Sequence, residues 1–321
     1  MLALPLALVL AAAAPAASDA TSSALQVLVA PEGAAALGEP AGVTTDALGR
    51  IWATDAAAHR IVRWDAEGRW LGESGALGSD DNQFRRPTSL ARLGSLGVAV
   101  LDVDNRRIMA FDQLMRRTDL VVTLDDPALE GVTGHVTPVA LAADRGGALY
   151  VADSDRDRLL VFDFAGNYRR TVGAYGTAAG SFHGLTGVAV AAHGEIVTLE
   201  RGLPPPRRRK GTPPDSTGAG VPARVQWLDA GGAPLASWDV PSDGSAVVSI
   251  AVDDSGRVAV GSEGGTGDEV RVFSIGGLPV ARIGGVSGPH SLAFAPDGSL
   301  LVAESGAGRV RRFRPFPAPG E

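Results

Sequence analysis

The sequence predicts an all-β protein, a single six-bladed β-propeller whose blades are four-stranded antiparallel sheets. Three observations predict this fold. Strand-like segments of about four to six residues with alternating apolar side chains recur along the chain, and turns separate them. One sequence unit occurs six times at a spacing of roughly 40–50 residues, which is typical of propeller blades. The 321 residues include 42 glycines, as a turn-rich chain requires, and no segment has a convincing helical period.

The repeated unit has the same four parts each time. A short apolar strand ends at a turn such as PDG or DSG, and a second strand of alternating apolar residues usually closes on Asp or Glu. A third strand of the type RIVRWD ends at a glycine turn, and a fourth of the type RTVG leaves the unit. The six units begin at Glu39, Arg86, Thr137, Leu185, Val247 and Gly288. Each unit is therefore expected to form one blade.

The third unit, GGALYVADSDRDRLLVFDFAGNY from Gly146, has the pattern G…Y-V-A-D…R-x-x-V-F. This pattern resembles the NHL repeat, and the likeness extends over about Leu25 to Phe313. The resemblance implies one NHL-type propeller domain over residues 24–316, followed by a short tail at 317–321. It is specific for architecture and says little about function.

Ring closure is predicted from a strand that the last unit lacks. The unit from Gly288 has three strands before the chain becomes Pro-rich, whereas the segment ALQVLVA, Ala24 to Ala30, precedes the first unit and has no other partner. We expect this N-terminal strand to complete the last blade. The pairing would join the two ends of the chain and remove two open sheet edges.

The N-terminus and the overall charge predict where the protein works. Residues 1–20 contain an apolar run followed by small residues, which favours a cleaved export signal and a periplasmic or extracellular location. The run is short for a transmembrane helix, so no transmembrane anchor is expected. The net charge of −7 argues against nucleic acid as a partner. The chain has no cysteine, and we expect a monomer without disulfides.

Acidic and arginine residues recur at fixed places in the units. The acid that ends the second strand precedes the arginine that begins the third by five residues in four units. A carboxylate and a guanidinium that flank one hairpin can form a bidentate pair, so we interpret them as structural. The acids are Asp55, Asp102, Asp153, Glu200 and Glu304, and the arginines are Arg60, Arg107, Arg158, Arg224 and Arg309. The fifth unit has Ser262 and Glu269 at these places.

The residue after the proline of the repeat opens the innermost strand and is expected to line the upper mouth of the central channel. These residues are Ala41, Thr88, Val139, Thr186, Val248 and His290. The peptidyl-hydroxyglycine amidating lyases, which this chain resembles in fold, carry a Pro-His pair here in three blades, and the three histidines hold zinc. Only Pro289-His290 matches that motif. His183 and His135 lie shortly before inner strands on the same face, so either the three histidines form a zinc cluster or each is an isolated loop residue.

A second enzymatic resemblance is to the gluconolactonase propellers, which hold a channel metal with one Glu, Asn residues and an Asp. Glu39 stands near the place of that Glu, but directly before the proline rather than two residues before it. The Asn and Asp partners are missing. Calcium is also conceivable at Glu263, Asp268 and Glu269, although the EF-hand spacing is absent. We therefore predict no resident metal, with zinc or calcium as the alternatives.

Residues 201–224 form an insertion in the fourth unit, RGLPPPRRRKGTPPDSTGAGVPAR. Three consecutive prolines favour an extended segment, and Arg207, Arg208, Arg209 and Lys210 concentrate positive charge. The insertion is either a contact for an anionic partner or a flexible loop without one.

Together these features predict an exported NHL-type propeller that acts as a binding or scaffold module. Its upper face would hold a protein, a peptide or an anionic ligand, and the candidate contacts are His290, His183, His135, Glu39 and the basic residues 207–210. The alternative is a metal-dependent lyase or lactonase that acts at the channel near His290.

Overall fold

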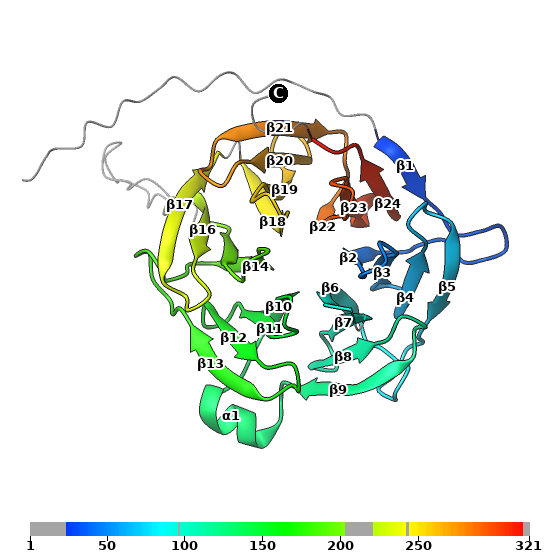
Figure 1. The fold of residues 1–321 in the computed structure, drawn as a ribbon, viewed down its shortest axis with the longest axis horizontal. Coiled ribbons are helices and arrows are strands. Elements are labelled where there is room, and N and C mark those ends of the chain that lie inside the picture. Colours follow the sequence, from blue (N-terminus) through cyan, green and yellow to red (C-terminus); the bar gives the residue numbers. More distant parts are fainter. Residues whose placement is uncertain (1–23, 96, 203–220, 242–243, 317–321) are drawn as a thin grey trace, which may run out of the picture.

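A computed structural model describes residues 24–95, 97–202, 221–241 and 244–316. These residues form six four-stranded antiparallel sheets arranged in a ring, as Figure 1 shows. The predicted six-bladed β-propeller is therefore confirmed. The expected export signal at 1–20, the tail at 317–321 and most of the insertion lie outside the described residues.

The first three blades are continuous in sequence. Blade one contains β2 (Pro40–Thr45), β3 (Ile51–Asp55), β4 (Arg60–Trp64) and β5 (Trp70–Ser74). Blade two contains β6 (Pro87–Leu93), β7 (Gly97–Asp102), β8 (Arg107–Phe111) and β9 (Arg117–Thr123). Blade three contains β10 (Pro138–Ala143), β11 (Leu149–Asp153), β12 (Arg158–Phe162) and β13 (Tyr168–Val172).

The other three blades follow the same order, except for the last strand of the last blade. Blade four contains β14 (Leu185–Val190), β15 (Ile196–Glu200), β16 (Ala223–Leu228) and β17 (Pro234–Val240). Blade five contains β18 (Ser245–Val252), β19 (Val258–Gly264), β20 (Glu269–Phe273) and β21 (Pro279–Gly284). Blade six contains β22 (Pro289–Phe294), β23 (Leu300–Glu304), β24 (Arg309–Phe313) and, from the N-terminus, β1 (Ala24–Leu28).

The closing strand pairs as the sequence predicts. β1 lies antiparallel to β24, with Ala24 opposite Phe313 and Leu28 opposite Val310. Leu28 is buried in the core between blades six and one. One blade is thus assembled from both ends of the chain, so the ring cannot open without breaking this ladder.

The core lies between the blades, where neighbouring sheets pack face to face. The second strand of a blade is covered on both sides, and every residue of β3, β11, β15 and β23 is buried. Their sequences therefore read as nearly continuous apolar runs, because no face of these strands meets water. The first strand of each blade is the innermost one and borders the central channel.

Two faces of the ring are distinguished below. The upper face carries the loops between the second and third strands and the connections from one blade to the next. The lower face carries the turns between the first and second strands and between the third and fourth. This division follows from the up-and-down order of the strands in each sheet.

The sequence did not predict an α-helix. Residues Pro127–Thr133 form a short helix, α1, in the connection from blade two to blade three. The Asp126 side chain accepts hydrogen bonds from the backbone N–H groups of Ala128 and Leu129, and a proline follows it at the first helical position. The Asp-Pro pair was therefore the one sequence signal for the start of this helix. Its seven residues are too few to show the 3.6-residue spacing of apolar side chains. No helix within the described ranges has the length and hydropathy needed to cross a bilayer.

Candidate functional site

The six inner strands enclose a cavity of about 860 Å³ along the axis of the ring. Its wall includes the whole set of residues that the repeat alignment placed there: Ala41, Thr88, Val139, Thr186, Val248 and His290. Five of these side chains are small and uncharged, and the sixth is an imidazole. The upper mouth therefore has uncharged side chains apart from this one imidazole.

Of the three predicted histidines, His290 is the one that lines this cavity. Its side chain is exposed, and Nδ1 lies 3.0 Å from the carbonyl oxygen of Ala41 in the neighbouring blade. A carbonyl oxygen can only accept a hydrogen bond, so Nδ1 carries the proton of the neutral ring. Nε2 is then the nitrogen with a lone pair for a ligand.

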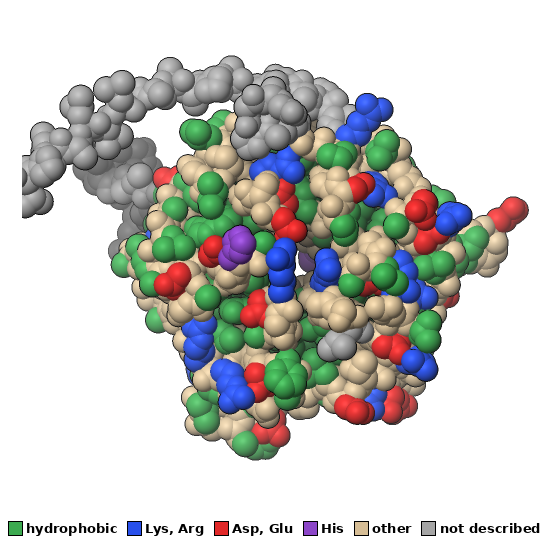
Figure 2. Space-filling view, viewed as in Figure 1, with side chains coloured by type: hydrophobic (Ala, Val, Ile, Leu, Met, Phe, Trp, Pro, Cys, Tyr) green, Lys and Arg blue, Asp and Glu red, His purple; other side chains and the backbone are tan. Residues whose placement is uncertain are grey.

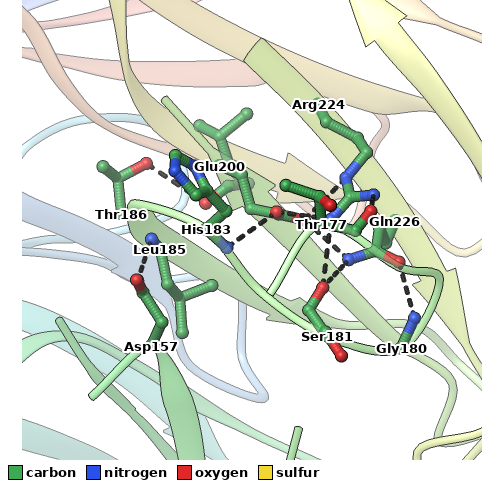
Figure 3. Close-up of polar contacts among 11 residues, drawn as sticks. Asp157, Thr177, Gly180, Ser181, His183, Leu185, Thr186, Glu200, Arg224 and Gln226 are labelled. Atoms are coloured by element: carbon green, nitrogen blue, oxygen red, sulfur yellow. Dashed lines mark hydrogen bonds and ion pairs between the residues drawn. The ribbon is translucent and has the colours of Figure 1, made fainter. Parts of the chain in front are cut away.

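His183 is buried in the loop that leads into β14 (Figure 3). Its backbone N–H donates to the Glu200 carboxylate at 2.9 Å, and its ring packs against Tyr175 with centroids 5.7 Å apart. Its Nδ1 is buried and has no hydrogen-bond partner in the described part of the chain. The residue therefore supports the loop through its backbone, and its ring does not open onto solvent.

His135 and Glu39 occupy exposed positions on the connections between blades. His135 Nε2 lies 3.0 Å from Arg106 Nη1, and its Nδ1 lies 3.6 Å from the Glu130 carboxylate. The Arg106 guanidinium can only donate, so Nε2 accepts. Glu39 contributes its backbone, since its N–H donates to Asp55 at 3.0 Å. Both residues thus belong to loop contacts at the rim.

The described residues contain no group of three or more His, Asp or Glu side chains placed to hold a metal ion. His135, His183 and His290 each contact different partners and do not form the cluster that a zinc lyase would need. The three acids considered for calcium do not converge either. Asp268 accepts backbone N–H groups from Gly264 and Gly288, and Glu269 pairs with arginines.

The recurrent acids form the predicted ion pairs. Asp55, Asp102 and Asp153 are fully buried and pair with Arg60, Arg107 and Arg158 at 2.8–3.0 Å between the nearest atoms. The pairs Glu200–Arg224 and Glu304–Arg309 complete the set at 2.7 and 2.6 Å. Each acid also accepts a backbone N–H from the loop that enters its own blade. These acids hold the upper loops in place, which confirms the structural interpretation.

Both carboxylate oxygens of Glu200 accept hydrogen bonds from neighbouring residues (Figure 3). Its carboxylate accepts hydrogen bonds from the backbone of His183, from Nε and Nη2 of Arg224 and from the Gln226 side chain. Arg224 in turn donates to the carbonyl oxygens of Thr177 and Ser181. With every oxygen engaged, Glu200 is not available as a catalytic base.

Sequence analysis missed a second set of contacts, which joins neighbouring blades on the upper face. His59 Nδ1 accepts from the Arg86 backbone N–H at 3.1 Å, and Asp157 accepts from the Leu185 N–H at 2.7 Å. Both residues have positive φ and directly precede the arginine of the third strand. Asp268 makes a similar contact to the loop entering blade six. A hydrogen-bonding residue directly before the first residue of the third strand was the only signal in the sequence.

The basic residues Arg207, Arg208, Arg209 and Lys210 lie outside the described residues. The insertion that contains them leaves from the upper face, because it connects the second strand of blade four, β15, to the third, β16. Arg224, at its end, is held by Glu200.

Comparisons with known proteins support the fold. No profile of a protein family matches the chain, and no curated sequence matches it. Among solved structures, hydrazine synthase of Kuenenia stuttgartiensis matches with a TM-score of 0.56 and 13% identity, over 89% of this chain and 99% of that one. Virginiamycin B lyase from Staphylococcus aureus matches with a TM-score of 0.54 and 12% identity, over 90% and 98%.

The β-propeller domain of Cps50 (Swd1) from Myceliophteria thermophila is also similar, with a TM-score of 0.51 and 12% identity, over 85% of this chain and 82% of that one. These proteins differ in function, and at such low identity they share the propeller architecture with this chain rather than an activity.

Proposed function

We propose that this protein is a binding module that holds a peptide segment or a small polar ligand at the upper mouth of its channel. One observation carries the proposal. The mouth opens into a cavity of about 860 Å³ whose rim side chains are small and uncharged, apart from His290. A site of this size takes a small ligand or part of a peptide chain, and its neutral rim suits an uncharged surface.

The backbone of the inner strands supports this choice of ligand. All six are edge strands of their sheets, so one side of each has backbone N–H and C=O groups without a neighbouring strand. Serine side chains use some of these groups, as when Ser291 accepts from the Val43 N–H at 3.1 Å. The remaining groups are suited to hydrogen bonds with a peptide.

The finer features of the function are part of the same proposal. The repeat pattern favours an NHL-type module, and the apolar N-terminus favours export to the periplasm or the medium. The insertion at 201–224 would add contacts to an acidic region of a partner. N-terminal sequencing of the protein from culture fractions tests export, since a signal peptide would be absent from the mature form.

The binding proposal is tested with two matched arginine substitutions. Val139 lies on the upper rim and Leu48 on a lower turn, and both side chains are exposed. A partner captured by the wild-type protein from the extracellular or periplasmic fraction should bind V139R at least about tenfold more weakly. It should bind L48R normally. Equal binding to V139R and wild type would show that the upper mouth is not the site.

The enzymatic alternative, a metal-dependent lyase or lactonase near His290, has its own readout. Stoichiometric zinc or calcium in the purified protein, removed by His290→Ala, would favour the enzyme over the binding module. Protein that carries no metal and keeps its partner would favour the binding module.

A further inference from the structure

The lower mouth of the channel differs from the upper mouth in its charge. The residues of the cavity wall at this end include Arg92, Asp144, Arg145, Asp253, Asp254 and Arg257. They come from blades two, three and five. Figure 2 shows side chains of both signs around the central opening. The charges at this end sum to zero, so their individual partners decide what they can bind.

One acid and one arginine at this mouth are held within their own turn. The Asp253 carboxylate pairs with Arg257 at 2.6 Å and also accepts two backbone N–H groups of the same turn. Arg257 donates in addition to the carbonyl oxygen of Phe316. Asp46 and Arg50 form an equivalent pair in blade one. These pairs stabilise turns and are not offered to a ligand.

A second pair crosses the opening. Arg145 Nη2 lies 3.1 Å from Asp254 Oδ1, although these residues belong to blades three and five, with blade four between them. Their side chains are 67% and 84% exposed. An ion pair this exposed contributes about 0–1 kcal/mol. Incoming charged groups can therefore replace it at low cost.

Two further charges at this mouth have no oppositely charged partner among the described residues. Arg92 is exposed, and its one hydrogen bond is a long one of 3.4 Å to the Gly94 carbonyl oxygen. Asp144 accepts the backbone N–H of Ala148, which stands where the corresponding turns have Arg50 and Arg257. Without that arginine, this carboxylate forms no ion pair within the part of the chain that the structure describes.

These two residues come from adjacent strands. Arg92 lies near the end of β6, and Asp144 directly follows β10, its neighbour around the channel. A Cβ built on Gly94 would lie 3.3 Å from the Arg145 carbonyl oxygen, so the two turns touch. The lower mouth thus presents one unpaired cation and one unpaired anion, next to an exposed ion pair.

We propose that the lower mouth is a second ligand site, which accepts a small zwitterion carrying a carboxylate and an ammonium group. Arg92, joined by Arg145, binds the carboxylate, because guanidinium groups match carboxylate geometry. Asp144, joined by Asp254, binds the ammonium group. A ligand with one charge would satisfy half of these groups and leave the other half facing a like charge. The site lies at the opposite end of the channel from the upper rim and does not depend on the function proposed there.

The test uses three probes that share the glycylglycine unit and differ in which ends are charged. Glycylglycine has both charges, N-acetylglycylglycine has the carboxylate alone, and glycylglycinamide has the ammonium group alone. Each is titrated into the full-length protein at low salt while amide NMR shifts are followed. We expect a saturable response with glycylglycine in the millimolar range, at amides of the lower turns of blades two, three and five. The single-charge probes should bind at least about tenfold more weakly.

Four substitutions separate this site from general surface charge. R92Q and D144N should each weaken glycylglycine binding by about tenfold, which corresponds to about 1.4 kcal/mol. D254N frees Arg145 and should strengthen binding of the carboxylate probe, whereas R145Q frees Asp254 and should strengthen binding of the ammonium probe. R116Q is the control, because Arg116 is an exposed, ion-paired arginine on a turn between a third and a fourth strand of the same face.

Several results would overturn the proposal. One is the absence of a saturable response to glycylglycine, and another is a response at the upper rim. An R116Q effect as large as that of R92Q would show that the response is nonspecific. The four substituted residues are exposed or partly exposed, and thermal unfolding of each variant establishes that the fold is intact before binding is compared.

Discussion

Blade five differs from the other five blades in how the backbone of the loop that enters the blade is hydrogen-bonded. In the five blades, a buried acid at the end of the second strand accepts backbone N–H groups from the loop that enters the blade. In blade five this position is Ser262, and the ladder between β18 and β19 continues past it to Ser245 opposite Gly264. Backbone pairing therefore replaces the carboxylate.

Blade five also has a buried acid, but it lies at the start of the third strand instead of at the end of the second. Glu269 faces Ser262 across the hairpin, at the place where the other blades have arginine. It is buried and pairs with Arg271 and Arg282 from the third and fourth strands. What the blades share is a requirement that the backbone of the entering loop be hydrogen-bonded, and the acid is one of two ways to meet it.

The largest expected effect is on the free energy of unfolding, and it distinguishes blades that use a buried acid from blade five. Asp55→Ala removes an acceptor of several hydrogen bonds and leaves the nearly buried Arg60 with one acid, Glu73. We expect a loss of about 3–5 kcal/mol in the free energy of unfolding. Ser262→Ala, at the same strand position in blade five, should cost about 1 kcal/mol or less. Urea unfolding of both variants measures the difference, and equal losses would contradict the comparison.

A smaller effect is expected in the pH dependence of stability, where two of the acids that end a second strand, Asp55 and Asp102, should differ. Burial alone would raise the pKa of Asp55, but the backbone N–H groups of Glu39, Gly38 and Ala58, with Arg60, outweigh it and lower the pKa below 3.8. Burial raises the pKa of Asp102 above 3.8, because its hydrogen bonds from Asn105, Arg85 and Arg107 do not compensate. The ionised form is thus favoured by folding at Asp55 and disfavoured at Asp102.

The stability of the wild type relative to each Asn variant should therefore have opposite pH slopes. The contribution of Asp55 is present above its unfolded pKa and is lost as the pH falls through its lower folded value. That of Asp102 is fully present below its unfolded pKa and is lost as the pH rises through its higher folded value. Urea unfolding of D55N, D102N and wild type from about pH 3 to 7 measures both slopes. Slopes of the same sign would show that the two carboxylates have equivalent environments.

The smallest expected loss of stability is for a partly exposed arginine among the recurrent acid–arginine pairs. The Arg309 side chain is 38% exposed, and its partner Glu304 also binds Arg311 at 2.6 Å. Arg309→Gln should therefore cost less than about 1 kcal/mol, and added salt should reduce the loss further. Thermal unfolding at low and high salt tests this, with the better buried Arg158→Gln as the reference. A large loss that salt does not change would mean that this pair behaves like a buried one.

The sequence predicted much of the fold because a propeller repeats local information. The alternation within strands, the five-residue spacing from Asp55 to Arg60 and the spare strand at Ala24 all belong to single hairpins or to a missing part of one unit. The channel-lining residues followed from the alignment of the repeats for the same reason. Helix α1 was not predicted because it lies in a connection between blades that the other units do not share.

The candidate sites were less predictable, because their contacts join residues of different blades. Proximity in sequence to the inner strands placed His135, His183 and His290 on one face, but not next to one another. Their partners are Arg106, Tyr175 and the Ala41 carbonyl group, and two of these lie in another blade or its connecting loop.

The sequence alone determined the number of blades, the closing strand and the acid–arginine pairs, since each depends on residues that meet within one sheet. Only the tertiary structure decided which side chains meet across the channel. Arg145 and Asp254 are 109 residues apart and come together at the lower mouth. The physical reason is geometric, because the curvature of the closed ring, set by the packing of blade against blade, fixes the distance between residues of separate blades.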